Sequence, residues 1–399
     1  MPRRILITGA SVAGLTAAWW LGEAGLEVEV VERSPEFREG GQNIDVRGVG
    51  REVLRRMGLE QAALERGTGE EGTAWVDEEG KAVAAFEVDG DHDGPTAELE
   101  ILRGDLAGLL YEPARSRARF RFGDHVTQVT DTGDGVSVRF AEGGSRDYEA
   151  VIIAEGVGST TRELVFPGEN APRWMDMTLG YFTIPRTDSD DRMWRWYNAT
   201  KGRSVSLRPD RHGTTRAILS LQKPSEGEQD WPVHRQKAFL REHFADAGWE
   251  TPRVLAGMEG TDDFYFDVLR QVRMERWSKG RVVLTGDAAW CATPMAGIGA
   301  TLALTGAYVL ARELARTTEA AAAFAHYEQV MRPMVEEGQG VPKIGLRMMN
   351  PRSRLGIKLL HGVLDLASRP PVRELGAKLL TRSPHEPDLS RYDDPPREG

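Results

Sequence analysis

The sequence of 399 residues predicts an α/β fold: a βαβ-based domain with a mixed sheet, an inserted, mainly β domain, and C-terminal helices. Residues 5–8 form a short apolar run, residues 12–22 carry apolar side chains at helical spacing, and residues 27–32 form a second strand. Strand, helix and strand within about 30 residues make a βαβ unit, whose crossover should be right-handed. Between about 172 and 275 the sequence changes to short strand-like runs rich in Trp, Tyr and Phe. The buried strand expected at 281–285 then returns the chain to the first domain.

Composition excludes several classes of protein. The net charge of −10 argues against a protein that coats nucleic acid, which needs clustered positive charge. The single cysteine, Cys291, cannot form an intramolecular disulfide, and the histidines show no spacing typical of a metal site. No apolar run of about 18 residues is present, so we expect no membrane-spanning helix. The expected location is the cytoplasm, without a nucleic-acid or membrane partner, and the sequence does not indicate an oligomeric state.

The remaining elements follow from apolar periodicity and from turn residues. Helices are predicted at about 48–66, 103–116, 233–247, 297–315, 319–340 and 354–381. A hairpin is predicted at 73–77 and 82–87, and three antiparallel strands at about 125–130, 135–140 and 147–153. From about Ser383 the chain is rich in Pro and charged residues, and we expect a mobile tail.

These elements divide the chain into interleaved domains. The first domain would consist of residues 1–72, 99–170 and 276–345. The second domain would consist of a hairpin at 73–98 and the β-rich segment 171–275. Residues 346–399 would form a C-terminal helix and the mobile tail.

The first motif lies between the two strands of the βαβ unit and reads Gly9-Ala10-Ser11-Val12-Ala13-Gly14. It matches the G-x-G-x-x-G dinucleotide fingerprint, except that Ser11 replaces the glycine at which the backbone approaches a pyrophosphate. The helix N-terminus supplies N–H groups and a positive dipole end. Glu32 stands about 20 residues later, where an acid is expected to bind ribose hydroxyls. A glycine-rich turn without a ligand is the alternative, and the dinucleotide itself could be NAD or FAD.

The second motif follows the strand at 281–285. It begins with Gly286-Asp287-Ala288-Ala289 and continues through a loop and helix start that contain Pro294, Gly297, Gly299, Ala300 and Thr301. A carboxylate at a strand end can accept hydrogen bonds from ribityl hydroxyls, and Pro and Gly let the chain pass flat against a ring. The helix start directs N–H groups toward the same place. A turn followed by a helix cap is the alternative, and the pairing with the first motif argues against it.

With these motifs the chain resembles the p-hydroxybenzoate-hydroxylase-type (class A) FAD-dependent monooxygenases, which include tetracycline-degrading and antibiotic-biosynthesis hydroxylases. The resemblance covers residues 3 to about 345. It rests on the two motifs and on three further segments: Glu32-Arg33, Gly41-Gln42-Asn43-Ile44-Asp45-Val46-Arg47, and Leu102-Arg103 with Leu106 and Leu110. It implies a Rossmann-like FAD-binding domain and noncovalently bound FAD.

The resemblance also implies roles for single residues. At the adenosine end, Glu32 would hold the ribose and Arg33 would lie near the adenine. At the flavin end, Asp45 and Arg47 would line the crevice. Arg103 would contact the ribityl–pyrophosphate region, and Asp287 would lie on its other side. The other cofactor contacts would come from Gly9, Ser11, Val12, Ala13, Gly14, Val126, Gly286, Pro294, Gly297, Gly299, Ala300 and Thr301.

The implied activity is hydroxylation of an aromatic or enolic small molecule, including polyketide-like ones. NAD(P)H would bind transiently and reduce FAD, and O2 would then form a C4a-hydroperoxide that delivers the oxygen. The flavin carries the difficult chemistry, while the protein positions the substrate and excludes water. The sequence indicates no catalytic base. Two alternatives remain open: a flavin oxidase or dehydrogenase that inserts no oxygen, and a non-catalytic flavoprotein that serves as a binding module.

The chain departs from the family pattern in two places. After the strand predicted to end at 153, Glu155 stands where the family has Asp, and Arg162 follows in the next turn. The additional methylene puts the nicotinamide-docking role of this segment in question. In the flavin loop, Thr301 takes the place of a familiar Asn and keeps a shorter hydrogen-bonding side chain.

Trp194-Arg195-Trp196 is similar to the W-x-W of flavin halogenases, but the next residues differ and no lysine follows the fingerprint. Strand alternation instead predicts that Trp194, Trp196 and Asn198 share one face of a sheet. With Tyr181 they are the candidates for the substrate pocket. For Cys291, a small buried thiol is favoured over a covalent flavin link or a redox role.

Overall fold

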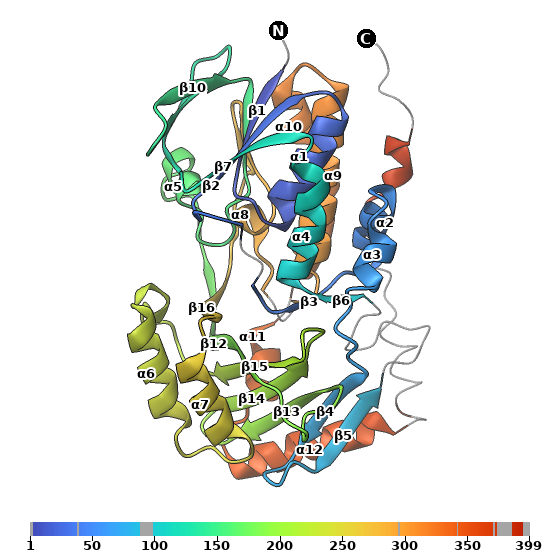
Figure 1. Ribbon diagram of the computed structural model, residues 1–399, viewed down its shortest axis with the longest axis vertical. Coiled ribbons are helices and arrows are strands. Elements are labelled where there is room, and N and C mark those ends of the chain that lie inside the picture. The colour runs from blue at the N-terminus through green and yellow to red at the C-terminus, as the bar shows by residue number, and fades with distance from the viewer. Residues whose placement is uncertain are drawn as a thin grey trace.

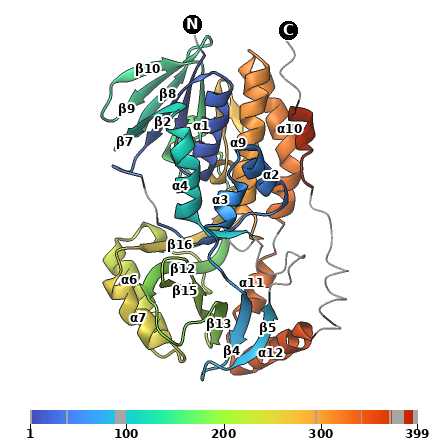
Figure 2. The same cartoon turned by 45° about the vertical axis from the view of Figure 1, so that its right-hand side comes forward.

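The computed structural model describes residues 3–37, 40–87, 99–293, 296–340, 342–369, 372 and 385–393. The described elements form two lobes stacked along the long axis of the molecule (Figure 1). We call them the upper lobe, which holds β1, β2 and the long helices, and the lower lobe, which holds β12 to β16. The view turned by 45° shows the same division (Figure 2).

The upper lobe is built on a sheet whose described strands run in the order β17-β18-β11-β1-β2-β7. Their bounds are β1 (Arg4–Thr8), β2 (Glu27–Glu32), β7 (Ala118–Phe122), β11 (Ala150–Ile153), β17 (Ser278–Lys279) and β18 (Val282–Leu284). All neighbours are parallel except β17 and β18. The central strands are buried along almost their whole length, as expected of a parallel sheet covered on both faces.

Helices cover this sheet. Helix α1 (Val12–Glu23) packs against α4 (Arg103–Ala114) and α9 (Gly299–Arg316), and α9 packs against α10 (Ala320–Gly338). The bounds of these four helices agree with the predicted ranges to within about two residues. The single helix predicted at 48–66 is wrong, because Gly58 adopts a φ of +71° and separates α2 (Gly48–Arg56) from α3 (Glu60–Leu64).

The predicted antiparallel meander is correct for two strands and wrong for the third. Strands β8 (Val126–Asp131), β9 (Val136–Phe140) and β10 (Ser145–Tyr148) form a small antiparallel sheet. The segment predicted as one strand at 147–153 divides at Glu149, whose N–H donates to the Arg4 carbonyl. The apolar run that follows enters the parallel sheet as β11, because its side chains are buried on both faces.

The lower lobe is a sheet whose described strands run in the order β16-β12-β15-β14-β13-β4-β5. Their bounds are β4 (Gly72–Val76), β5 (Ala82–Glu87), β12 (Arg173–Pro185), β13 (Met193–Ala199), β14 (Arg203–Pro209), β15 (Thr214–Leu221) and β16 (Phe264–Gln271). The predicted hairpin β4–β5 joins this sheet through a parallel pairing of β4 with β13. One face packs on α6 (Val233–Phe244) and α7 (Thr251–Gly260). Only α6 was predicted, and the boundaries proposed for the domains remain a prediction.

The two lobes are linked by a short pairing of β3 (Asn43–Asp45) with β6 (Glu100–Leu102). Helix α11 (Lys343–Met349) packs against β12 near the boundary of the two lobes, and α12 (Arg354–Ser368) packs against β5 at the foot of the lower lobe (Figures 1 and 2). Of the helical segment predicted to run from 354 to 381, residues 373–381 lie outside the described residues. No described helix is long and apolar enough to cross a membrane.

The expectation of a mobile tail is wrong for residues 385–393. These residues return to the upper lobe, where the Tyr392 side chain is buried and its hydroxyl donates to the Glu313 carboxylate at 2.5 Å. Asp393 forms an ion pair with Arg56. Composition alone missed this because two anchoring side chains, Leu389 and Tyr392, are enough to fix a charged segment to an apolar surface.

Candidate functional site

The carboxyl ends of four parallel strands lie at one edge of the upper sheet. The register pairs Thr8 with Val31 and Ile153, and Ile153 with Leu284, so β1, β2, β11 and β18 end side by side. Each strand is followed by a segment that the sequence singled out, although these segments lie up to about 270 residues apart. Ligands of open α/β sheets bind outside the carboxyl ends of the strands.

The fingerprint loop is packed so tightly that only glycine fits at two positions. Gly9 has a φ of +98°, and a Cβ built on it would lie 2.6 Å from the Ala154 carbonyl oxygen. A Cβ on Gly14 would lie 1.9 Å from the carbonyl oxygen of Gly9. Ser11 is the N-cap of α1, but its side chain makes no capping hydrogen bond and the first turn has no acidic residue. The N–H groups at Val12, Ala13 and Gly14 thus open a helix whose positive end is not neutralised by its own side chains.

Glu32 lies at the end of β2 and fixes this loop in place. Its carboxylate accepts hydrogen bonds from the N–H of Ala10 and the N–H of Ser34, both at 2.9 Å. The neighbouring Arg33 side chain is exposed. The carboxylate expected at the ribose is therefore oriented by two main-chain donors beside the fingerprint.

The second motif lies against the first. A Cβ on Gly286, which has a φ of +60°, would come within 2.9 Å of the Ala13 Cβ. Asp287 opens α8 (Asp287–Trp290), and its side chain is exposed to solvent. Burial nevertheless raises the pKa of Asp287 to about 6, against the lowering effects of the Arg103 charge and of the Cys291 thiol, which donates to the carboxylate. A group that keeps solvent contact while enclosed by protein lies in a crevice.

The flavin loop and the segment at 45–47 meet at the same edge. The Arg47 N–H donates to Thr301 Oγ1 at 2.9 Å, and Arg47 Nη2 donates to Asp45 Oδ2 at 3.1 Å. A Cβ on Gly297 would lie 3.8 Å from Asp45 Oδ2. Gly299 begins α9 and Ala300 follows, and Ile298 caps this helix without a side-chain bond. Pro294 lies outside the described residues.

Arg103 and Val126, the two remaining residues predicted to contact the cofactor, lie in different surroundings. Arg103 begins α4 beside Gly41, and its buried Nε has no hydrogen-bond partner in the described structure. Val126 is buried in the core, so it could reach a cofactor only through its main chain. An orphaned cationic donor, a cradle closed to any Cβ and a carboxylate in a crevice together fit FAD.

The lower sheet turns one face toward this edge. Register places five residues in one row across it, namely Tyr181, Ile218, Ser206, Trp196 and Trp75. Trp194 and Asn198 lie on the same face as Trp196, because side chains alternate along a strand. The Trp194 and Trp196 ring centroids are 5.0 Å apart. The four predicted pocket residues thus share one sheet face, opposite the face that packs on α6 and α7.

A buried ion cluster that sequence reasoning missed lies beside these indoles. The Arg208 guanidinium stacks on Trp194, 4.0 Å from the ring centroid, and pairs with Glu70 at 2.8 Å and Glu100 at 2.9 Å. Asn43 donates to Glu100. Burial raises the pKa of Glu100 to about 7, although the Arg208 charge lowers it. Each of these charges, taken singly in the sequence, is typical of a solvated surface, and only the folded register brings them together.

The departures from the family pattern have structural reasons. Glu155 accepts hydrogen bonds from Ser159 Oγ at 2.8 Å and from the Thr161 N–H at 3.0 Å, so it caps α5 (Thr160–Val165). Arg162 is buried, with Nη1 donating to the Ala288 carbonyl at 3.2 Å. Cys291 is buried, and burial raises the pKa of its thiol, which makes it a poor nucleophile.

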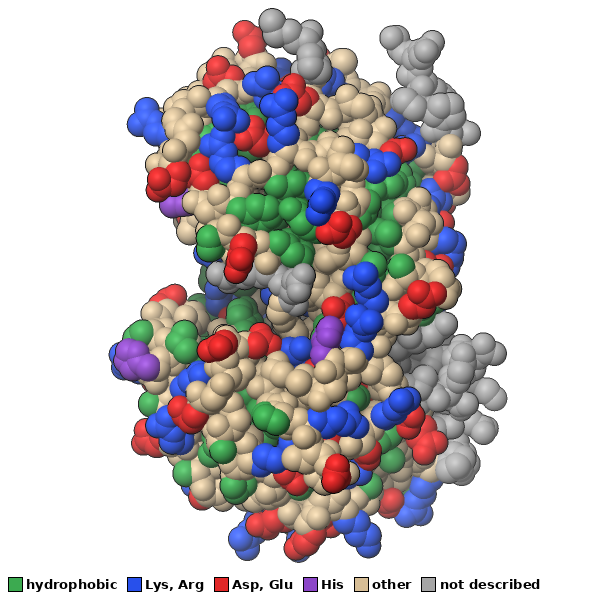
Figure 3. Space-filling model, in the orientation of Figure 1, with side chains coloured by type: hydrophobic (Ala, Val, Ile, Leu, Met, Phe, Trp, Pro, Cys, Tyr) green, Lys and Arg blue, Asp and Glu red, His purple; other side chains and the backbone are tan. Residues whose placement is uncertain are grey.

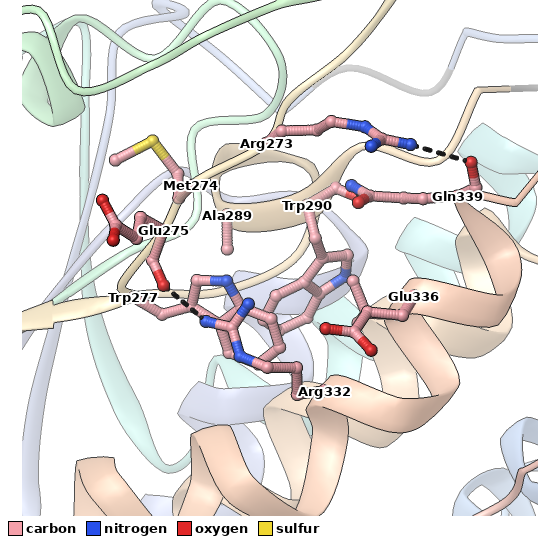
Figure 4. Close-up of a pocket in the computed structure, with 10 residues that line it drawn as sticks. Arg273, Met274, Glu275, Trp277, Ala289, Trp290, Arg332, Glu336 and Gln339 are labelled. Carbon is pink, nitrogen blue, oxygen red and sulfur yellow. Dashed lines mark hydrogen bonds between the residues drawn. The ribbon is translucent and has the colours of Figure 1, made fainter.

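A separate pocket of about 290 Å³ lies beneath α8 (Figure 4). Trp290 of α8, Arg332 of α10 and Arg273 of the connection after β16 line it. Both arginines already donate to main-chain carbonyls, Arg332 to Glu275 at 2.9 Å and Arg273 to Gln339 at 3.0 Å. None of the predicted cofactor residues lines this pocket, and we assign it no ligand.

Comparison with known proteins points to one family. The model of a family described as FAD binding domain matches residues 3–337. The chain is 32% identical to the FAD-dependent monooxygenase asL6 of Sarocladium schorii, over 98% of both chains. It is 35% identical to a flavin-dependent monooxygenase of an unknown prokaryotic organism, covering 84% of this chain and 88% of that one. Among solved structures, the tetracycline destructase Tet(51) matches with a TM-score of 0.78 and 30% identity, over 92% of this chain and 97% of that chain.

Proposed function

Because the chain belongs to the FAD-binding-domain family and is a class A FAD-dependent monooxygenase, we propose that it hydroxylates an aromatic or enolic, polyketide-like small molecule with NAD(P)H and O2. The balanced reaction converts a substrate C–H bond, O2, NAD(P)H and a proton into C–OH, water and NAD(P)+. The observation that carries the choice of substrate is that Tyr181, Trp196 and Trp75 share one row of the lower sheet face, which suits a flat, ring-containing molecule. The 30% identity to a tetracycline destructase favours the same class.

The residues assigned to FAD are those at the carboxyl edge of the upper sheet. They are Gly9, Ser11, Val12, Ala13, Gly14, Glu32, Arg33, Asp45, Arg47, Arg103, Val126, Gly286, Asp287, Gly297, Gly299, Ala300 and Thr301. The N–H groups at the start of α1 would bind the pyrophosphate, and Asp287 would accept ribityl hydroxyl bonds. Arg103 would supply a compensating charge, because its charge already acts on Asp287.

Bound FAD supplies a two-electron carrier that accepts a hydride and activates O2. The chain's own residues would orient the substrate. The Trp194 and Trp196 indoles, tilted by 43° to each other, would form an apolar wall beside the substrate, and Arg208 holds Trp194 by a cation–π contact at 4.0 Å. Tyr265 and Tyr181 connect this face to the cofactor edge, since the charges of Asp267 and Asp287 both act on the Tyr265 hydroxyl. The molecule narrows between the two lobes (Figure 3).

We propose a cytoplasmic location, where NAD(P)H is available to the enzyme. The test is a panel of polycyclic phenols incubated with the FAD-loaded protein, NAD(P)H and isotopically heavy O2. We expect a product that carries one heavy oxygen atom. Hydrogen peroxide with an unlabelled oxidised product would identify an oxidase or dehydrogenase, and tight substrate binding without turnover would identify a binding module.

A further inference from the structure

Helix α12 exposes a continuous apolar stripe to solvent. Leu355, Leu359, Val363 and Leu366 are 68%, 63%, 65% and 53% exposed. Their spacing of four, four and three residues places them on one side of the helix. Isolated exposed apolar residues are ordinary, but a run of them on one face marks an interaction surface.

The opposite side of α12 already holds the helix to the lower lobe. It packs against β5, and Ile357, Leu360 and Leu364 are partly buried there. His361 on this inner side lies 3.3 Å from Asn198 Oδ1, so the helix touches the sheet face assigned to the substrate. The outer stripe is therefore not needed to attach the helix, and its side chains are exposed on a helix that lies at the foot of the molecule (Figure 1).

Basic side chains border the stripe. At 100° per residue, Arg354, Lys358 and Arg369 fall along one rim of the four apolar residues. These three cations face a single acid on α12, Asp365, in a chain with a net charge of −10, whereas Lys343 and Arg347 of α11 pair with Asp176 and do not belong to this surface. Within the described residues, Arg354 and Lys358 have no ion-pair partner, while Asp365 is paired with Arg369. The surface is thus apolar along its centre and positive along its rim.

We propose that this face, the α12 stripe with its basic rim, docks on the surface of an anionic lipid bilayer. An amphipathic helix with Leu and Val on one side and Lys and Arg beside them lies in the plane of a membrane interface, held by apolar burial and by attraction to anionic headgroups. A second copy of the chain fits less well, because pairing would bring two positive rims together. Four side chains also fall short of the roughly 20–30 residues that each partner of a stable dimer contributes. The sequence predicted no membrane partner because it contains no apolar run long enough to span a bilayer. A helix that lies on the bilayer surface does not need such a run.

The test uses the full-length, FAD-loaded protein and sedimentation with large vesicles. One set contains neutral phosphatidylcholine alone, and the other also contains phosphatidylserine. We expect binding to the anionic vesicles, weaker binding to the neutral ones, and loss of binding as salt is raised. Leu359→Gln with Val363→Gln, and separately Arg354→Glu with Lys358→Glu, should each weaken anionic binding roughly tenfold or more.

Matched controls come from the upper lobe. Leu164→Gln removes an exposed leucine that is 47% exposed on α5, and Arg115→Glu with Arg119→Glu reverses two charges far from α12. Both controls should bind vesicles like the parent, and all variants should keep the parent's flavin content. The proposal is overturned if the parent does not bind anionic vesicles, or if the controls lose as much binding as the α12 variants. It is also overturned if light scattering shows a dimer that Leu359→Gln with Val363→Gln dissociates while vesicle binding stays unchanged.

Discussion

The hydroxyl of Thr301 accepts a hydrogen bond from the backbone N–H of Arg47 at 2.9 Å, across 254 residues of sequence. It joins the first turn of α9 to the N-cap of α2. Gly50 of α2 packs directly against Thr301, since a Cβ built on Gly50 would lie only 2.9 Å from the Thr301 Cα. The start of α9 is therefore held at a fixed distance from Arg47 and Asp45, the two residues proposed to line the flavin crevice.

Replacement of Arg47 tests its place in this crevice. Arg47→Ala removes the charge beside Asp45 and should weaken FAD binding by about 1.5–3 kcal/mol, or about 10–150-fold in Kd. Titration of the apo-protein followed by flavin fluorescence measures the effect. Arg55→Ala, on the exposed side of the same helix, is the control and should leave the Kd unchanged. An equal Kd for Arg47→Ala and the parent would remove Arg47 from the site.

The ionisation of Asp287 should make FAD binding dependent on pH. With a pKa of about 6 in the protein, the carboxyl is neutral below that pH and becomes a stronger hydrogen-bond acceptor above it. We expect the affinity for FAD to rise as pH increases from 5 to 7. Asp287→Asn should bind weakly at every pH and lose this slope, and Asp287→Ala should be isolated largely without flavin. Asp267→Asn separates the two carboxyls, because burial, and to a smaller extent the charge of Asp287, raise the pKa of Asp267 to about 6, while its side chain belongs to the lower sheet. If the dependence of FAD affinity on pH disappears in Asp267→Asn and persists in Asp287→Asn, the titrating group is Asp267 and not Asp287.

The start of α9 should influence the flavin potential. Two-electron reduction places negative charge on the flavin, and a helix N-terminus is worth up to ~2 kcal/mol toward a partly buried anion. Ala300→Asp should therefore lower the midpoint potential by up to ~40 mV, at ~30 mV per 1.4 kcal/mol for two electrons. Ala322→Asp makes the same change in the first turn of α10 and should have no effect. Equilibrium reduction against a reference dye measures the midpoint potential. Equal potentials for Ala300→Asp and the parent would show that α9 does not begin at the flavin.

The ionisation of Glu100 should lower the free energy of unfolding as pH rises. Its pKa of about 7 in the folded protein exceeds the ordinary value of 4.5, so between these values the folded chain holds a proton that the unfolded chain has released. The free energy of unfolding should then decrease with rising pH across that window. Glu100→Gln, which cannot ionise, should flatten this part of the Tm-against-pH curve. The exposed Glu71→Gln serves as the control, and the same slope in Glu100→Gln and the parent would contradict the assignment.

Substrate should accelerate reduction by NAD(P)H. The described chain contains one strand–fingerprint–helix unit, so the nicotinamide must dock on a surface shared with the substrate side. Binding of one ligand can then set the geometry for the other. Stopped-flow absorbance with and without a substrate found in the panel measures the rate of flavin bleaching. Identical rates would eliminate this coupling and leave FAD binding unaffected.

Sequence patterns predicted those elements whose structure depends on residues close together in the chain. The βαβ unit, the long helices and the hairpin β4–β5 follow from periodicity and turn residues, and both motifs reach one sheet edge as the resemblance implied. What the sequence missed depends on pairing between distant segments. The division of a strand at Glu149 follows from competition between two sheets, and the cluster of Arg208, Glu70 and Glu100 forms only when β14 meets the segment around β6.

The upper sheet joins strands that lie more than 270 residues apart, from β1 (Arg4–Thr8) to β18 (Val282–Leu284), and this affects how the chain folds during synthesis. A ribosome releases β1, β2 and β11 long before β18, which pairs with β11, and before α9, which packs on α1. During that interval β11 has an unpaired edge, a feature that promotes aggregation in partly folded chains. Contacts between residues so far apart also slow folding. Expression at a low level, which keeps partly folded chains dilute, should therefore raise the soluble yield, and fragments that end before residue 299 should be insoluble.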